Sequence, residues 1–481
     1  MLLAELFPYA HVVWIVFTVL YALTILGTIV VVISENRNPV KSLAWVTVLI
    51  LLPVLGALLY LFFGRSLRGQ RLISRTSSIH LRQLEDVPSI DDRQLPLTAE
   101  SKQMIRMVNS IAEPHYFGGC HIDIYTEGAQ KFAALKRDLL AAEHYINIQY
   151  FIFLADKIGQ ELSDILIAKA QQGVKVRVIY DHVGSMAVAK SFFVRMRRAG
   201  VEAYPFLKVT LTTLANRLNW RNHRKLVIID GRIGYIGGMN VADRYVYGSR
   251  GQRPWRDTHL RVTGNAVKAM QFQFAVDWCF MRRGLLEQPT VTVDSKPGEA
   301  DGIQLVGSGP TDLWNGMAMV FQRAIGLAKH SIYIQTPYFL PNEGLVRALQ
   351  QAALSGVDVR LMIPEDPDSK TLRYSSFSYV KEMLLAGIKV YFYQGRMLHS
   401  KMVLVDEELV TVGSTNFDYR SFEHNFEWNA LIYSRDFNAR MRHVFIDDMR
   451  SCQRITLPHW TRRPLGQRML ESLARLLSPL L

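Results

Sequence analysis

The sequence His-Arg-Lys-Leu-Val-Ile-Ile-Asp occupies residues 223–230, and residues 399–406 repeat its pattern as His-Ser-Lys-Met-Val-Leu-Val-Asp. After each copy, a turn of small residues ends in an asparagine, Asn240 in the first case and Asn416 in the second. A single His-x-Lys-x4-Asp spacing arises by accident in many chains. Two copies with the same extended pattern are hard to obtain by chance. They predict a duplicated protein with one functional motif in each half.

The motif residues form a chemically sensible set. The four apolar residues after each lysine predict a short buried strand. Because strand side chains alternate between faces, His223 and Lys225 share one face, as do His399 and Lys401. An ammonium beside an imidazole suits a phosphate, since the cation neutralises oxygens while the ring attacks or donates a proton. Satisfied core histidines with surface lysines are the alternative, which the repetition disfavours.

Supporting groups accompany each motif. Asn240 and Asn416 are placed to hold phosphate oxygens, and Asp230 and Asp406 to buttress the motifs through hydrogen bonds. Two carboxylates, Glu427 and Asp257, are each expected on a strand that returns beside the histidine of their own half, where they could fix its tautomer. For Asp257, a surface ion pair with Arg256 or Arg253 remains the alternative.

The duplication extends beyond the motifs. Residues 141–149 match 327–335, and residues 173–178 match 356–361. Each half predicts helices alternating with short apolar strands, which indicates an α/β sandwich with mostly parallel sheets. We expect one active site between the halves. The predicted organisation is a membrane hairpin (1–65), a polar connector (66–115), half 1 (116–293), half 2 (302–452) and an amphipathic tail (453–481).

The N-terminal region predicts a two-helix transmembrane hairpin with spans at about 12–33 and 43–63. A cleaved signal peptide fits poorly, because the first apolar run is long, lacks a basic start and leads into a second span. Four arginines follow the second span, so the positive-inside rule places the catalytic body in the cytoplasm: Arg65, Arg68, Arg71 and Arg75.

Composition narrows the partners. The chain of 481 residues has 56 Lys and Arg against 42 Asp and Glu, a formal net charge of +14. This excess favours an anionic partner, either nucleic acid or an anionic membrane, and the hairpin favours lipid. Three cysteines show no metal or disulfide spacing, consistent with a reducing compartment. No metal site and no cofactor are predicted.

The C-terminal tail has apolar residues at helical spacing from Pro464 onward, with arginines on the other side. Two interpretations remain open for this helix: it lies at a membrane interface, or it docks on the protein core.

The paired motifs identify the chain as similar to the phospholipase D superfamily. Within it, the hairpin, the stretch Thr336–Pro341, the stretch Asn416–Phe422 and the tail resemble bacterial cardiolipin synthases. That resemblance implies transfer of a phosphatidyl group between two phosphatidylglycerol molecules, giving cardiolipin and glycerol without a metal, in the bacterial inner membrane. It further implies a phosphatidyl-histidine intermediate, with His223 as nucleophile and His399 as acid and then base.

Three other functions remain open from the residues alone. A membrane-bound phospholipase D would use water as the second nucleophile and give phosphatidic acid. A membrane-tethered nuclease would use the same motifs on another phosphodiester. A catalytically silent scaffold is the third, and two complete motifs argue against it. The oligomeric state and the acceptor alcohol are not predicted.

Overall fold

A computed structural model describes residues 10–34, 39–60, 64, 69, 73–74, 76–77, 79–81, 95–112, 116–209, 219–248, 251–281, 283–286 and 301–480. The chain divides into two compact units. Residues 1–66 and 209–219 form the first, and residues 67–208 and 220–481 form the second. The four arginines expected to orient the chain and most of the polar boundary at 294–301 lie outside the described residues.

The first unit is built on α1 (Ala10–Ser34), which contains no Asp, Glu, Lys or Arg. Residues Val12–Ser34 are long and apolar enough to cross a membrane, and no other helix of the described ranges meets that test. The second predicted span begins as α2 (Pro39–Leu51) and α3 (Pro53–Leu59), which are separate helices because Pro53 lacks the N–H that would continue α2. A continuous second helix is therefore not observed.

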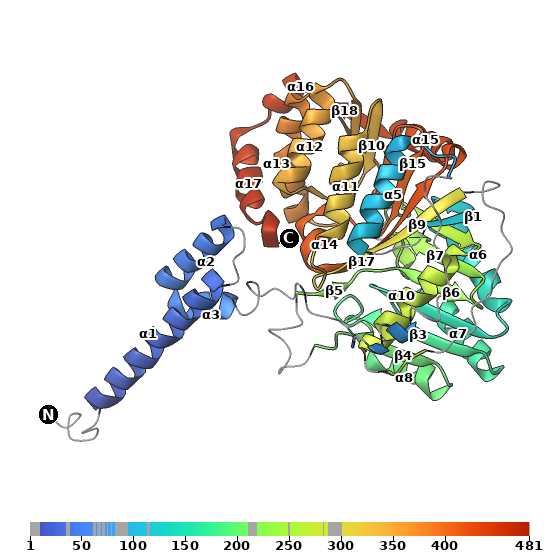
Figure 1. Ribbon diagram of the computed structural model, residues 1–481, viewed down its shortest axis with the longest axis horizontal. Coiled ribbons are helices and arrows are strands. Elements are labelled where there is room, and N and C mark those ends of the chain that lie inside the picture. The colour runs from blue at the N-terminus through green and yellow to red at the C-terminus, as the bar shows by residue number, and fades with distance from the viewer. Residues whose placement is uncertain are drawn as a thin grey trace. The chain divides into compact units, whose positions relative to one another are not determined.

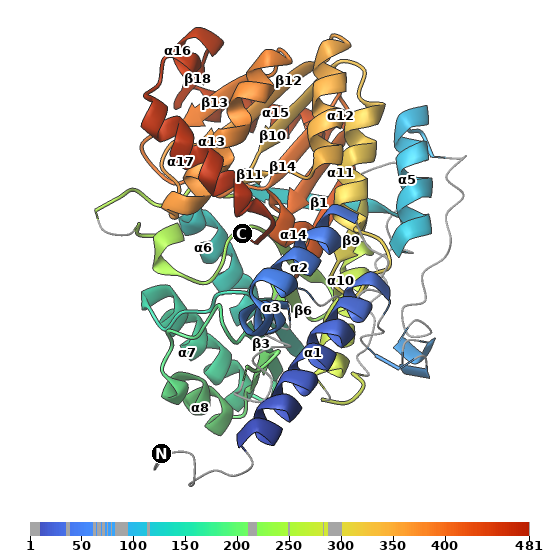
Figure 2. The same cartoon turned by 90° about the vertical axis from the view of Figure 1, so that its left-hand side faces the viewer.

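The second unit contains a 16-stranded mixed sheet that runs through both halves (Figures 1 and 2). Its order is β18-β13-β12-β10-β14-β15-β17-β9-β1-β8-β7-β6-β2-β3-β4, with β5 paired to β17. The strands of the first half are β1 (Tyr116–Tyr125), β2 (Tyr145–Tyr150), β3 (Lys175–Asp181), β4 (Glu202–Phe206), β5 (Arg221–Asn222), β6 (Leu226–Ile229), β7 (Ile233–Gly237) and β8 (His259–Thr263). Those of the second half are β9 (Asp301–Ser308), β10 (Ser331–Gln335), β12 (Asp358–Pro364), β13 (Lys389–Tyr393), β14 (Met402–Val405), β15 (Leu409–Gly413), β17 (Asn425–Tyr433) and β18 (Cys452–Ile455). Strands β11 (Phe339–Leu340) and β16 (Phe417–Asp418) form a separate pair.

The prediction of mostly parallel sheets is wrong. Parallel pairing is confined to β2-β3-β4, to β10-β12-β13 and to the two-residue pairs of β5 with β17 and β11 with β16. The centre of the sheet is antiparallel. The motif strands explain the difference, because β6 and β7 are joined by a tight turn at Asp230-Gly231 and β14 and β15 by one at Asp406-Glu407. A connection this short can only reverse the chain.

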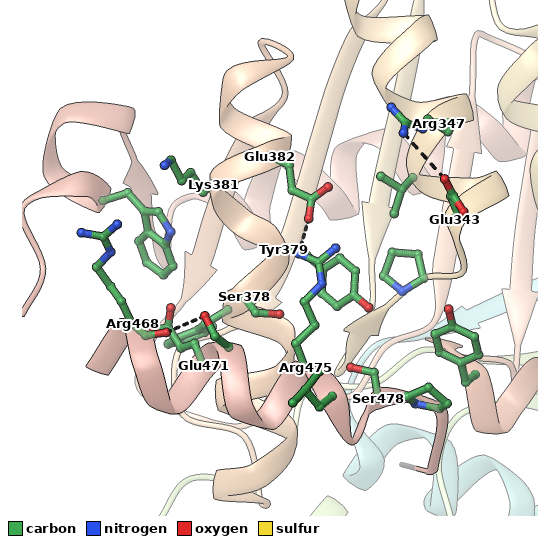
Figure 3. A pocket seen from close by; sticks show the side chains of 18 of the residues that line it. Glu343, Arg347, Ser378, Tyr379, Lys381, Glu382, Arg468, Glu471, Arg475 and Ser478 are labelled. Carbon is green, nitrogen blue, oxygen red and sulfur yellow. Dashed lines mark hydrogen bonds and ion pairs between the residues drawn. The ribbon is translucent and has the colours of Figure 1, made fainter. Parts of the chain in front are cut away.

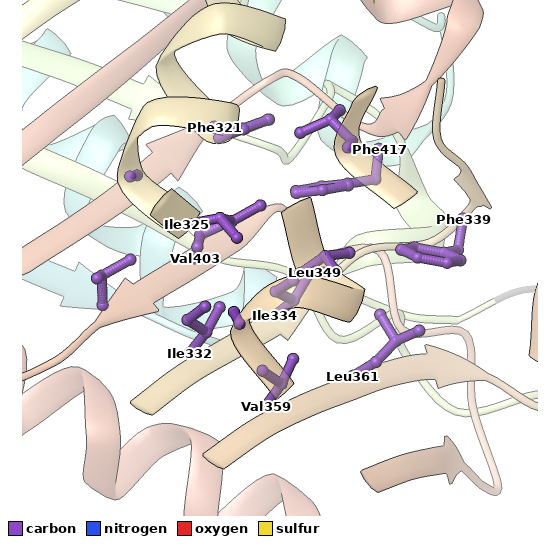
Figure 4. Close-up of a cluster of buried hydrophobic side chains, with 14 of the residues drawn as sticks. Phe321, Ile325, Ile332, Ile334, Phe339, Leu349, Val359, Leu361, Val403 and Phe417 are labelled. Carbon is purple, nitrogen blue, oxygen red and sulfur yellow. The ribbon is translucent and has the colours of Figure 1, made fainter. Parts of the chain in front are cut away.

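Helices cover both faces of the sheet. On one face lie α6 (Gly128–Leu140), α7 (Lys157–Gln171) and α8 (Lys190–Arg198) over half 1, and α11 (Gly316–Leu327), α12 (Glu343–Leu354) and α13 (Lys370–Leu385) over half 2. Figure 4 shows Ile325 and Leu349 of these helices packed on Ile332 and Val359 of the sheet. On the other face, α10 (Ala266–Phe280) and α15 (Arg435–Met449) share one hydrophobic cluster. One hydrophobic cluster on this face thus spans both halves.

Helix α5 (Ala99–Ala112) differs from its predicted role, whereas the tail packs on the protein, one of the two interpretations predicted for it. Helix α5 lies in the stretch predicted as a polar connector, yet its Met104, Ile105 and Val108 are buried in the core beside α11. The tail region contributes β18 to the sheet edge and then forms α16 (Leu457–Thr461) and α17 (Leu465–Leu476). Helix α17 lies along α13 (Figure 2).

Candidate active site

Each motif histidine is positioned by backbone contacts with the other half of the chain. Strand β5, just before His223, pairs in parallel with the start of β17, and the His223 N–H donates to the Phe426 carbonyl at 2.9 Å. In the same way, Leu398 forms a bridge with Arg256, and the His399 N–H donates to the Arg256 carbonyl at 2.7 Å. The two motifs therefore meet at the junction of the halves.

The histidine–carboxylate pairs are crossed between halves. His223 Nδ1 lies 3.0 Å from both carboxylate oxygens of Glu427, and His399 Nδ1 lies 2.6 Å from Asp257 Oδ2. The expectation that each carboxylate serves the histidine of its own half is wrong, because β17 and β8 are central strands that carry their neighbouring residues to the opposite half. The surface ion pair considered for Asp257 is also excluded, since Asp257 is fully buried and Arg256 pairs with Asp448.

The motif lysines are buried beside the histidines. Lys225 Nζ donates to the His223 carbonyl at 2.6 Å, and Lys401 Nζ donates to the His399 carbonyl and lies 2.8 Å from His399 Nδ1. Burial lowers the pKa of Lys225 well below its usual value and that of Lys401 to about 8. A bound anion would favour the charged form of both ammonium groups.

Burial keeps both histidines neutral at pH 7. It lowers the pKa of His223 to about 4, against the opposing effect of Glu427. It also lowers the pKa of His399 well below its usual value, and Lys401, Lys225, Arg244 and His223 add to that lowering. With an Nδ1 proton directed at the carboxylate, each ring keeps Nε2 unprotonated, and Nε2 forms no hydrogen bond within the described chain.

The two carboxylates have unequal support. Glu427 accepts from Ser414 Oγ at 2.5 Å and Asn425 Nδ2 at 3.1 Å. Although burial raises the pKa of Glu427, His223, Lys225 and the Ser414 hydroxyl outweigh it, and the net pKa is lowered. Asp257 accepts from the Thr258 N–H, and burial raises its pKa to about 6. The residue equivalent to Ser414 is Gly238, where a Cβ would lie 2.1 Å from Asp257 Oδ1.

The last residue of each motif fastens the motif strand to its neighbour. The Asp230 carboxylate accepts from the N–H groups of residues 143, 144 and 145 at 2.7–2.8 Å. Asp406 accepts from those of residues 329, 330 and 331 at 2.7–2.9 Å. Both aspartates have positive φ, 51° and 49°, which Asp tolerates better than most residues. Their contacts are with backbone and not with the histidines.

The two asparagines are buried near the histidines. Asn240 accepts from the Ile152 N–H at 3.1 Å and donates to Tyr245 Oη at 3.1 Å. Asn416 donates to Asp418 Oδ2 at 2.9 Å, and its Oδ1 is a buried oxygen with no hydrogen-bond partner among the described residues. These bonds fix both amide groups within the site.

Two buried arginines, each next to a motif histidine or its carboxylate partner, bind an aspartate that also accepts from a glutamine. Arg224 donates to both oxygens of Asp277 at 2.7 Å, and Gln149 donates to the same carboxylate at 2.5 Å. Arg256 binds Asp448 at 2.7 and 3.0 Å, and Gln335 donates there at 2.8 Å. The second arginine comes from half 1, so this pair also joins the halves.

Sequence reasoning missed several site residues. Tyr245 Oη lies 3.3 Å from His399 Nδ1, and Asp418 caps the helix α14 (Tyr419–Glu423) beside Asn416. Tyr245 belongs to no repeated pattern in the sequence, so nothing pointed to it. Asp418 lies two residues after the motif asparagine and could have been predicted as a site residue. Within the described ranges, no group of three or more His, Cys, Asp or Glu could hold a metal ion.

Comparisons with known proteins agree with this geometry. The family described as "Cardiolipin synthase, PLD-like domain" matches residues 135–254 and 321–449, and "Phospholipase_D-nuclease N-terminal" matches residues 22–65. The chain is 38% identical to a cardiolipin synthase of Geobacillus kaustophilus, over 97% of this chain and 94% of that protein. It is 39% identical to the major cardiolipin synthase ClsA of Bacillus subtilis, over 97% and 99%.

A crystal structure of phosphatidylserine synthase from Haemophilus influenzae has the same fold, with a TM-score of 0.60 and 12% identity over 79% of this chain and all of that one. Two matched segments, one in each half, carry the two motifs, and the relatives align over nearly their whole length. The chain therefore belongs to the cardiolipin synthase family of the phospholipase D superfamily.

Proposed function

We propose that this protein is a phosphatidyltransferase that joins two phosphatidylglycerol molecules into cardiolipin and releases glycerol. The observation that carries the proposal is the crossed pair of buried dyads, His223–Glu427 and His399–Asp257, each next to a motif lysine. Two imidazoles and two ammonium groups in one electrostatic cluster suit a phosphodiester that must be attacked, held and released.

In the first step, His223 Nε2 attacks phosphorus of one phosphatidylglycerol, and the bond from phosphorus to the headgroup glycerol oxygen breaks. The departing oxygen takes a proton from His399. We assign the nucleophilic role to His223 because Glu427, kept ionised by His223, Lys225 and Ser414, holds the Nδ1 proton of the ring and leaves Nε2 unprotonated. Asp257, with a pKa of about 6, can share a proton with His399, and an arriving phosphodiester favours protonated His399.

In the second step, a hydroxyl of the other phosphatidylglycerol gives its proton to His399 and attacks phosphorus. The bond between phosphorus and His223 then breaks, which restores the neutral ring. Lys225 and Lys401 neutralise the non-bridging oxygens of the phosphate, and Asn240 and Asn416 hold the same oxygens. Asp230 and Asp406 hold the motif strands in register, as their backbone contacts indicate. This scheme needs no metal, because the lysines supply the positive charge.

The proposal includes a membrane location. Helix α1 anchors the chain, a second crossing follows within residues 43–63, and the basic residues after it keep the catalytic unit in the cytoplasm. Anionic phosphatidylglycerol would then be both substrate and attractant. A reporter fused after Leu481 that is active only outside the cytoplasm would overturn this orientation.

The test of the reaction is incubation of the purified chain with phosphatidylglycerol labelled in its headgroup and acyl chains. Cardiolipin with one released glycerol per cardiolipin is the expected result. Phosphatidic acid with glycerol would mean that water is the acceptor and would replace the transferase by a hydrolase. An inert chain would refute both.

A further inference from the structure

Helix α17 packs with a polar face against the protein and its apolar face outward, the reverse of an ordinary surface helix. Its buried residues include Glu471 and Ala474, followed by Ser478, at 1–8% exposure. Six apolar residues on the other side of the helix and just after it are instead 46–75% exposed: Leu465, Met469, Leu470, Leu473, Leu476 and Leu477. An amphipathic helix in contact only with water and protein turns its apolar face inward. The exposed face therefore requires another apolar environment.

Specific polar contacts hold α17 in this orientation. Ser375 of α13 donates to the Ala474 carbonyl at 3.0 Å, and its hydroxyl lies 2.8 Å from the Ser478 hydroxyl. Glu471 forms a bidentate pair with Arg463, and Arg475 pairs with Glu382 of α13 (Figure 3). These bonds hold Glu471, Ala474 and Ser478 against the protein, so the outward direction of the leucines is built into the fold.

A cleft with a volume of about 680 Å³ lies between α17 and α13 (Figure 3). Five cationic side chains line it against three carboxylates, Glu343, Glu382 and Glu471. Three of the cations are paired with those carboxylates, namely Arg347, Arg463 and Arg475. Lys381 and Arg468 line the cleft without a carboxylate partner among the described residues. The cleft thus has two positive charges in excess, next to the exposed leucines.

We propose that α17 docks on an anionic bilayer, with its leucines among the acyl chains and a lipid phosphate between Lys381 and Arg468. An apolar helix face edged by arginines matches the interface of an anionic membrane in both polarity and charge. A second copy of the chain would fit less well, because a symmetric contact would bring together two helix faces that are both edged by arginines.

Docking through α17 also connects the membrane to the active site. Tyr419 lines the cleft and begins α14, immediately after Asp418, whose carboxylate accepts from the motif amide of Asn416. A lipid surface held at α17 would therefore contact a segment that leads directly back to Asn416 of the second motif. This surface is separate from the residues that perform the chemistry.

The test uses the full chain in lipid nanodiscs, where α1 retains the protein in every sample. An environment-sensitive fluorophore is attached at Leu473→Cys, and at Leu354→Cys as the matched control, with Cys279 and Cys452 replaced by Ser. Leu354 is 74% exposed on α12. Brominated acyl chains should quench the probe at 473 several-fold more than at 354, and more with phosphatidylglycerol than with phosphatidylcholine alone. Equal quenching at both positions would overturn the proposal, as would a dimer that protects position 473 from the quencher.

An activity measurement separates docking from catalysis. The triple variant Leu470→Ser/Leu473→Ser/Leu476→Ser should lose about tenfold in rate on bilayer phosphatidylglycerol but keep its rate on a short-chain, monomeric form. Leu140→Ser/Leu354→Ser is the control for exposed leucines. Lys381→Ala/Arg468→Ala should reduce the preference for anionic bilayers, unlike Lys175→Ala/Arg454→Ala. Unchanged bilayer rates in the triple variant would contradict the proposal. If the wild type turns over neither substrate, the proposed function fails while the quenching result still decides docking.

Discussion

His223 and Glu427 are 204 positions apart in the chain, yet Nδ1 of the histidine lies 3.0 Å from both oxygens of the carboxylate. The reciprocal pair, His399 with Asp257, spans 142 positions in the opposite sense. Each half of the protein therefore supplies an imidazole and receives its carboxylate partner from the other half.

Removing a carboxylate should damage catalysis while leaving the fold intact. Glu427→Gln and Asp257→Asn keep the shape of each side chain but lose the charge that fixes the imidazole tautomer. We expect each to lower kcat by about 10²–10⁴-fold. The double variant His223→Ala/Glu427→Gln should be little worse than His223→Ala alone, because residues that act as a unit are not additive. Fully additive losses would show that the two residues act separately.

The rate should depend on pH as a bell. Asp257 has a pKa raised to about 6, so acidification below pH 6 protonates it and removes the partner of His399. Lys401 has a pKa lowered to about 8, so its charge is lost as the pH rises through 8. We expect kcat/KM to be highest between these values. In Lys401→Arg the alkaline limb should move to higher pH, and an unmoved limb would mean that another group controls it.

Gly238 should be intolerant of a side chain. A Cβ at this position would lie 2.1 Å from Asp257 Oδ1, so Gly238→Ala should displace the carboxylate and lower activity by about 10²-fold, with a loss of about 1–3 kcal/mol in unfolding free energy. Gly326→Ala on α11 is the matched control, since nothing lies within 4 Å of its Cβ and the change should be neutral or slightly stabilising. Thermal unfolding and lipid turnover of both variants would check this, and an active Gly238→Ala would refute it.

Asp230 should contribute mainly to stability. Asp230→Ala leaves three backbone N–H groups without their acceptor and puts alanine at a φ of 51°, for a combined cost of about 3 kcal/mol. Asp230→Asn should cost less, because Asn adopts that conformation and retains one acceptor oxygen. Asp164→Ala, which removes one exposed ion pair, should change the unfolding free energy by less than about 1 kcal/mol. Similar effects of Asp230→Ala and Asp164→Ala in thermal denaturation would contradict this role.

Chelation should not inactivate the protein. The positive charge near the phosphate comes from Lys225 and Lys401, so turnover in detergent should persist in excess EDTA. Loss of activity that is restored by added Mg²⁺ or Zn²⁺ would reveal a metal requirement.

The motifs were enough to predict strands β6 and β14, because the pattern of apolar residues after each lysine is local. The repeat of residues 141–149 at 327–335, which ends in Gln149 and Gln335, could also be recognised directly. The direction of strand pairing was missed, although the turn at Asp230-Gly231 was visible and forces an antiparallel return. The crossed dyads could not be predicted, since they depend on the order β17-β9-β1-β8 at the centre of the sheet. No local pattern specifies which half a central strand will face. Arg256 suggested a surface position for Asp257, but the distant Asp448 allows that arginine to be buried.

The exchange of carboxylates has a consequence for the history of the chain. Each half alone contains a histidine with no acid to orient it, and would complete a dyad only by meeting another copy of itself. The protein is thus organised as a two-fold dimer whose members are joined covalently. The two halves depend on each other once they are joined. A substitution near Glu427 changes the environment of His223, and one near Asp257 changes that of His399. Loss of either carboxylate therefore impairs the histidine of the opposite half.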